Sequence, residues 1–120
     1  MEIITSILIL FVAFEHLAFL YLEMFLWTKD VGRKVFGTSK EEAEATKVLA
    51  ANQGLYNGFI SAGLIWGFFH SNPEVGSQIT LFFLGCVVIG GVYGAITAKI
   101  SILYLQAFPA ALTIALILLL

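Results

Sequence analysis

The sequence predicts an all-α fold, an integral membrane four-helix bundle that forms one domain over residues 1–120. Of the 120 residues, 60% are hydrophobic and 12% are charged, and the mean hydropathy is +0.98. A soluble domain of this size would lack the polar surface that it needs to cover its core. Four long apolar stretches also follow one another, and each approaches the roughly 20 residues with which a helix crosses a bilayer.

Helices are expected in these stretches because a bilayer offers no water to unpaired backbone groups. The first stretch has no basic residue before it and no small-residue cleavage site after it, so we expect a retained span and not a signal peptide. Pro109 is expected to bend the last helix, because it has no N–H to offer the carbonyl of Leu105. The predicted spans are Ile3 to Trp27, Lys47 to Phe69, Gln78 to Ala98 and Ile100 to Leu120.

The connections between the spans differ in length. Residues 28–46 form the only long one, and within it Ser39 and Glu42 have the spacing of a capping box. The second helix is therefore predicted to begin near Lys40 and to extend into the cytoplasm. Asn72-Pro73 and Gly76 predict a turn within residues 70–77. The short stretch 97–101 predicts a tight hairpin between the last two helices.

The basic residues predict the orientation in the membrane. All six lie in or beside the first and third connections: Lys29, Arg33, Lys34, Lys40, Lys47 and Lys99. The positive-inside rule places these connections in the cytoplasm and both termini outside. The predicted location is thus the cell membrane, with a multi-pass topology. The net charge of -2 argues against nucleic acid as a partner.

Polar side chains inside the first two predicted spans are candidates for ligand binding or proton coupling, because ionisable groups are costly in a bilayer. Helical periodicity lets the ionisable ones share one broad face of the first helix. In an antiparallel hairpin, Glu23 is expected level with Asn52 and Gln53, and Glu15 level with Asn57. We expect one polar cavity that opens toward the cytoplasm. The candidate site residues are Glu15, His16, Glu23, Asn52, Gln53, Tyr56 and Asn57.

Other readings of the same residues stay open. Amide and tyrosine side chains also join membrane helices by hydrogen bonds without any chemical role. Glycines at small-xxx-small spacing indicate close packing within the chain or a homodimer through Gly90, Gly91 and Gly94. The sequence has no glycine-rich phosphate loop and no pair of histidines at metal-ligand spacing, so neither a cofactor nor a metal is expected.

Three segments carry a family resemblance: Glu15-His16, residues 22–27 (LEMFLW) and residues 46–59 (TKVLAANQGLYNGF). On these segments the chain resembles, across nearly its full length, small bacterial and fungal membrane proteins catalogued as domain of unknown function 1304. The resemblance implies a four-helix membrane protein and no particular activity. In residue types alone, the chain is also similar to membrane glutathione transferases and sterol-isomerase-like proteins, which are four-helix membrane enzymes.

These observations predict binding or transport of a small or lipophilic molecule, with Glu15 or Glu23 exchanging a proton or binding a cation. Whether the protein is an enzyme stays open. One alternative is acid–base chemistry by Glu and His on a lipophilic substrate inside the membrane. Another is a non-catalytic accessory protein that binds a partner through residues 28–46. The expected partners are the lipid bilayer, a small or lipophilic ligand and a second copy of the chain.

Overall fold

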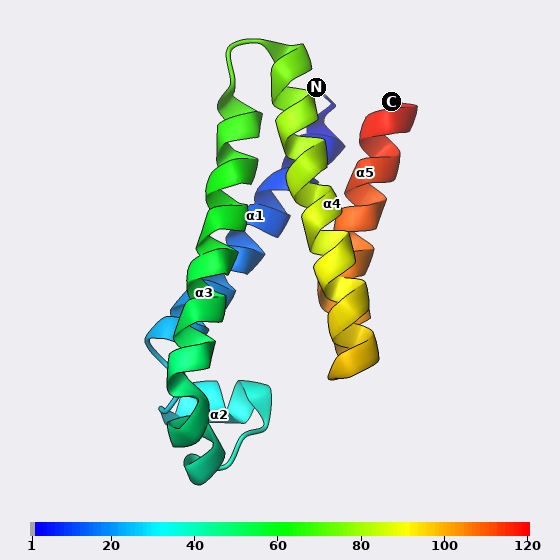
Figure 1. Ribbon diagram of the computed structural model, residues 1–120. Coiled ribbons are helices and arrows are strands. Elements are labelled where there is room, and N and C mark those ends of the chain that lie inside the picture. Colours follow the sequence, from blue (N-terminus) through cyan, green and yellow to red (C-terminus); the bar gives the residue numbers. More distant parts are fainter. Residues whose placement is uncertain (1) are drawn as a thin grey trace. The chain divides into compact units, whose positions relative to one another are not determined.

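The computed structural model describes residues 2–120, and over this range it contains helices and no strand (Figure 1). The predicted all-α fold class is confirmed. The elements are α1 (Ile3–Met24), α2 (Asp30–Phe36), α3 (Lys40–Phe69), α4 (Pro73–Thr97), the π-helical turn η1 (Leu103–Ala107) and α5 (Phe108–Leu119).

Two helices, α1 and α4, are long and apolar enough to cross a membrane. The other two predicted spans differ from them. α3 has 30 residues, but its middle contains Asn52, Gln53 and Asn57. The apolar helix that covers residues 103–119 is shorter than α1 and α4.

α2 lies where the sequence analysis predicted a loop, and that prediction was wrong. The helix has Asp30 in its first turn and Arg33 and Lys34 in its last turn, charges that suit the two ends of the helix dipole. Gly37 ends it with a φ of 68°, a left-handed conformation that glycine adopts without a steric cost. These signals are local, but a helix of seven residues is too short to form without support from tertiary contacts.

The start of α3 at Lys40 is confirmed, and so is the capping box that predicts it. The backbone N–H of Glu42 donates to the Ser39 hydroxyl at 3.1 Å, and the backbone N–H of Ser39 donates to the Glu42 carboxylate at 3.1 Å. The two residues thereby satisfy each other's free N–H groups at the helix end.

The connection between α3 and α4 is shorter than residues 70–77. α4 begins at Pro73, and the side chain of Asn72 caps it by accepting from the N–H groups of Glu74 and Val75. Gly76 lies inside α4 and not in the turn. A Cβ atom at Gly76 would lie 2.5 Å from the carbonyl oxygen of Gly67, so this glycine permits the close approach of α4 to α3.

The chain divides into two compact units, residues 14–61 and residues 2–13 with 62–120. In the second unit α4 packs against η1 and α5, as the predicted tight hairpin requires. A Cβ atom at Gly91 would lie 2.8 Å from Ala107 Cβ, and one at Gly94 would lie 3.1 Å from Ile102 Cγ2. These two glycines therefore pack within the chain. The homodimer through this helix, like the single domain, stays a prediction.

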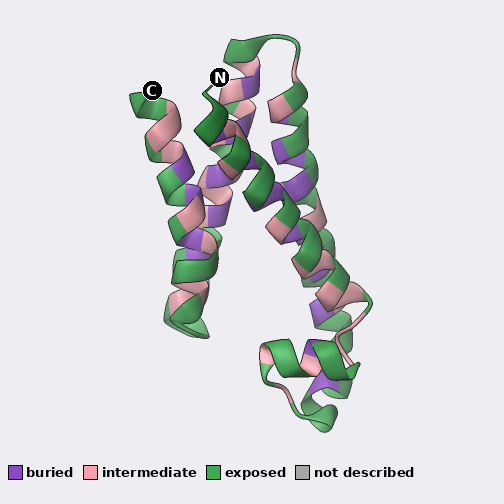
Figure 2. Ribbon diagram, turned by 180° about the vertical axis from the view of Figure 1, so that it is seen from behind, coloured by how far each residue is buried: buried purple, intermediate pink, exposed green. Residues whose placement is uncertain are grey.

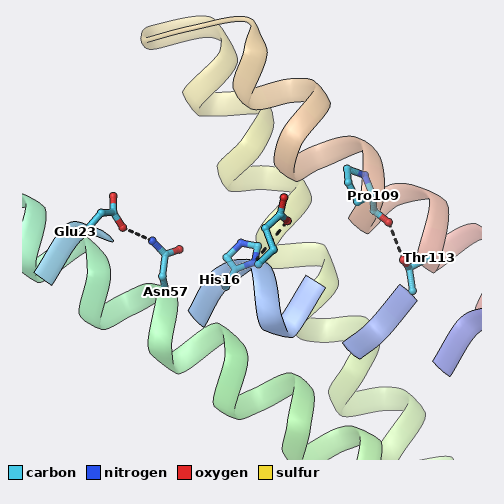
Figure 3. Close-up of polar contacts among 6 residues, drawn as sticks. His16, Glu23, Asn57, Pro109 and Thr113 are labelled. Atoms are coloured by element: carbon cyan, nitrogen blue, oxygen red, sulfur yellow. Dashed lines mark hydrogen bonds and ion pairs between the residues drawn. The ribbon is translucent and has the colours of Figure 1, made fainter. Parts of the chain in front are cut away.

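A local change of helix type directly precedes Pro109, and the bend at this residue stays a prediction. The N–H of Phe108 donates to the carbonyl of Leu103, five residues earlier, and Pro109 follows directly without an N–H of its own. π-helical turns of this kind occur as single turns inside α-helices. Beyond the proline, the Thr113 hydroxyl donates to the Pro109 carbonyl at 2.7 Å (Figure 3).

Exposed residues lie along every long helix (Figure 2), and many of them are large and apolar. Phe14 on α1 is 70% exposed, Ile89 on α4 is 73% exposed and Leu119 on α5 is 81% exposed. The fully buried side chains include polar ones such as Thr80 and Thr113 as well as Leu84. A surface this apolar is unusual for a monomer in water.

Candidate functional site

Within residues 14–61, two glycines of α3 bring that helix close to α1. A Cβ atom at Gly54 would lie 2.8 Å from Met24 Cγ and 3.1 Å from Glu23 Cβ. One at Gly58 would lie 2.6 Å from Leu20 Cδ1. The small-xxx-small pair therefore packs inside the hairpin, where it lets the backbones approach as such pairs do between membrane helices.

Glu23 and Asn57 meet across this hairpin (Figure 3). The Asn57 side-chain amide donates to Glu23 Oε1 at 2.6 Å, although the two residues are 34 positions apart. Asn57 is buried and Glu23 is half-buried. The hydrogen bond holds one carboxylate oxygen and fixes the orientation of the whole carboxyl group.

A groove of about 390 Å³ opens beside Glu23. The end of α1, the turn after it and residues 47–52 of α3 form its walls. A lining of this mixed character suits a ligand with one polar and one apolar part. The polar lining residues are Glu23, Thr28, Lys47 and Asn52, and the apolar ones are Met24, Phe25, Trp27, Val48 and Ala51.

Trp27 holds one side of the groove in place. Its indole N–H donates to the Thr46 hydroxyl at 3.1 Å, and that hydroxyl donates to the Glu42 carbonyl at 2.7 Å. The indole ring also lies 4.9 Å, centre to centre, from the ring of Phe36 on α2. Trp27 therefore joins the end of α1 to both α2 and the start of α3.

The positive charge at the rim of the groove is already paired. Lys47 Nζ lies 2.7 Å from Glu44 Oε1, and this hydrogen bond, together with the charge of Lys47, holds the pKa of Glu44 below its usual range. Both side chains are more than half exposed, so the pair contributes little stability. Among residues 2–120, Glu23 has no ion-pair partner, and it is the carboxylate in the groove lining.

Glu15 and His16 form a second polar group two turns earlier on α1. His16 is 1% exposed, and its Nδ1 atom lies 4.0 Å from Glu15 Oε1. The His16 ring also meets the ring of Phe19 edge-on at 5.5 Å. Seven residues of helix separate His16 from Glu23, a rise of about 10 Å.

The structure brings some of the predicted residues together and separates others. Glu23 bonds to Asn57 and shares its groove with Asn52. Glu23 also lies level with Gly54, next to Gln53, as expected, but the amide that bonds to it is Asn57, which was expected level with Glu15. Gln53 is exposed, and Tyr56 is 62% exposed with its ring against Phe59.

Sequence reasoning missed several groove residues. Trp27 was predicted only as the end of the first span, and Lys47 as the start of the second span and an orientation signal, although both line the groove. The signal that could have found them is their position: each lies four or five positions along the chain from a predicted site residue, Glu23 or Asn52. Among the described residues there is no group of three or more His, Cys, Asp or Glu side chains that could hold a metal ion.

A second pocket, of about 460 Å³, lies in the unit formed by residues 2–13 and 62–120. None of the seven candidate site residues contributes to it. Its lining is Glu2, Thr5, Gly67, Phe68, His70, Pro73, Gly76, Ser77, Leu116, Ile117 and Leu120.

Comparisons with known proteins agree with the resemblance seen in the sequence. Residues 10–118 match the family described as "Protein of unknown function (DUF1304)". The chain is 37% identical over 108 residues to "Uncharacterized protein YpaA" of Lactococcus lactis subsp. lactis (strain IL1403), a match that covers 88% of this chain and 89% of that protein. No solved structure matches. Because the match spans nearly the whole sequence, the chain belongs to the DUF1304 family.

Proposed function

We propose that this chain is a multi-pass membrane protein that binds a small or lipophilic molecule in the groove beside Glu23 and carries it in exchange for a proton. The exposed apolar side chains of α1, α4 and α5 support the membrane location. Surfaces as apolar as these aggregate in water but are favourable against lipid tails.

The Glu23–Asn57 hydrogen bond is the observation that carries the proposal. A neutral amide fixes the carboxylate without neutralising its charge. A carboxylate in an apolar setting is costly unless a cation, a proton or hydrogen-bond donors compensate it. The groove beside Glu23 offers space for a ligand that supplies such a group.

The lining of the groove favours a ligand of a particular chemistry. Its polar end would be an organic cation or a hydrogen-bond donor that pairs with the Glu23 carboxylate. Its apolar end would contact Met24, Val48 and the indole of Trp27, all of which line the groove. Aromatic faces such as that of Trp27 also attract organic cations.

A fluorescent alkylamine carrying a dansyl group tests the binding step. In a Trp66→Phe background Trp27 is the only tryptophan, so energy transfer from Trp27 to the probe reports binding in the groove. Glu23→Gln keeps an oxygen that accepts from Asn57 but removes the charge, so we expect affinity to fall about tenfold or more, the effect of 1.4 kcal/mol. The matched control is Glu41→Gln, the same change at an exposed position. Equal affinity in the two variants would contradict the proposal.

Proton movement tests the transport step. Vesicles that contain the protein and a pH-sensitive dye should show a pH change when the amine is added, and this change should be absent in Glu23→Gln. If the amine binds but no proton moves, the chain is a binding protein and not a transporter. Conversion of the probe without any gradient would instead favour the enzyme alternative, with Glu15 and His16 as its acid–base pair.

A further inference from the structure

α2 packs against the residues that directly follow α1, and it lies beside the start of α3 (Figure 1). Gly32 is buried, and a Cβ atom there would collide with the backbone of Leu26. Phe36, one turn later, lies against Trp27 at a ring distance of 4.9 Å. Because Trp27 is itself bonded to Thr46, these contacts fix α2 at the level where α1 ends.

One flank of α2 is apolar and exposed. Val31 and Val35 are each 56% exposed. They are four residues apart, so they lie one above the other on the same face of the helix. This flank lies about 100° around the helix from Gly32 and Phe36, beside the face that contacts Leu26 and Trp27.

Basic residues outnumber acidic ones in and directly beside α2. Residues 28–40 contain four basic residues and one acidic residue. The acidic one, Asp30, is 3.5 Å from Arg33. Lys29 and Lys34 are exposed and have no ion-pair partner among residues 2–120. Lys34 lies next to Val31 on the helix surface, because the two are three residues apart.

We propose that α2 lies in the interface of the bilayer and binds anionic lipid headgroups through Lys29 and Lys34, with Val31 and Val35 in the acyl boundary. The inference rests on the membrane location proposed above and is independent of the ligand groove. α1 is long and apolar enough to span and ends at Met24, six residues before α2 begins. Trp27, the residue that holds α2, is of the type that gathers at membrane interfaces.

This placement follows from two general properties of membrane surfaces. Amphipathic helices with basic side chains lie in the interface plane with their apolar face in the headgroup–acyl boundary. Anionic lipids attract basic residues close to the surface, and each contributes about 1 kcal/mol, or about a fivefold change in affinity. The charge of α2 thus complements an anionic leaflet and not a neutral one.

Trp27 reports on the lipids beside α2. The full chain with Trp66→Phe is reconstituted in vesicles that contain either brominated phosphatidylglycerol or brominated phosphatidylcholine at the same mole fraction. Bromine quenches tryptophan only at short range. We expect stronger quenching of Trp27 by the anionic lipid, and we expect this preference to weaken as salt screens the charges.

Two variants that each remove one positive charge distinguish the contribution of α2 to lipid binding from that of the rest of the chain. Lys34→Gln should lower the preference for the anionic lipid about fivefold, whereas Lys99→Gln should leave it unchanged. Equal quenching by both lipids in the parent chain, or an equal preference in both variants, would overturn the inference. If the chain does not float with the vesicles, the membrane location fails and this inference fails with it. If the alkylamine still binds but both brominated lipids quench Trp27 equally, only the proposed lipid contact is refuted.

Discussion

The amide of Asn57 lies 2.6 Å from the carboxylate of Glu23 and ties the middle of α3 to the end of α1. The same carboxyl group lines the groove. One side chain therefore takes part in helix packing through one oxygen and is available to a ligand at the groove. This double role lets stability and binding be separated by substitution.

The first prediction concerns the hydrogen bond itself. Asn57→Ala leaves Glu23 without its donor, and an unsatisfied buried polar group costs about 1–3 kcal/mol. Glu23→Gln should cost less, because a glutamine oxygen still accepts from Asn57. A double-mutant cycle of Asn57→Ala with Glu23→Ala, which removes the acceptor as well, should give a coupling of about 0.6–2 kcal/mol in the unfolding free energy measured in detergent. Strictly additive effects of the two substitutions would show that the two side chains do not interact.

The second prediction concerns the glycines. Gly54→Ala should destabilise the protein by about 1–3 kcal/mol, because its new methyl group would meet Met24 and Glu23. Gly90 is the control, since a Cβ atom there meets nothing within 4 Å. Gly90→Ala should stabilise α4 by about 0.5–1 kcal/mol through backbone entropy alone. Thermal unfolding measures the stability of both variants. A Gly54→Ala variant more stable than Gly90→Ala would argue against the packing of α1 on α3.

The third prediction concerns the end of α2. Gly37 has a φ of 68°, which an L side chain adopts at a cost of about 1–2 kcal/mol. Gly37→Ala should therefore loosen the segment between α2 and α3, while Gly37→Asn should be tolerated better because asparagine enters this region more readily. Proteolysis of residues 36–40 in the folded protein measures the difference. Equal cleavage rates in the two variants would show that α2 does not end in this conformation.

The fourth prediction is a pH dependence at the start of α3. The backbone N–H of Ser39, and then its hydroxyl, lower the pKa of Glu42. A carboxylate with a lowered pKa stabilises the fold above its unfolded pKa, and the stabilisation is lost as the pH falls through the lowered value. The first turn of α3 should therefore loosen in acid. An NMR titration of the Glu42 side chain should show a midpoint below the ordinary glutamate value, and Ser39→Ala should raise it. A midpoint at the ordinary value in the parent chain would be incompatible with the capping box.

The sequence predicted most closely what local signals determine. The start of α3 depends on Ser39 and Glu42, which are three residues apart. The start of α4 was predicted at Gln78, five residues late, because Asn72 and Pro73 were interpreted only as a turn and not as a helix cap. The position of α2 could not be predicted in the same way, because Gly32 and Phe36 are held by Leu26 and Trp27. These are tertiary contacts that a short helix needs in order to persist.

The hydrogen-bond partner of Glu23 was not predicted for a related reason. Counting residues from assumed membrane boundaries places Glu23 near Asn52 and Gln53, in agreement with its position against Gly54, but it pairs Asn57 with Glu15 and not with Glu23. The register is determined by how Gly54 and Gly58 fit against Met24 and Leu20. That fit depends on the shapes of two helices together, and no single sequence pattern describes it.

Disulfide cross-linking in isolated membranes tests the central claim most directly, since it requires α1 and α3 to pair in the register that joins Glu23 to Asn57. Leu20 Cδ1 and Cγ lie 2.6 Å and 3.9 Å from where a Cβ atom at Gly58 would lie, so the side chains at these two positions face each other, as the two cysteines of a disulfide must. In a Cys86→Ala background, which has no other cysteine, Leu20→Cys with Gly58→Cys should cross-link rapidly on oxidation. Leu20→Cys with Phe59→Cys, at an exposed neighbouring position, should not. Rapid cross-linking of the second pair and none of the first would contradict the hairpin on which the site depends.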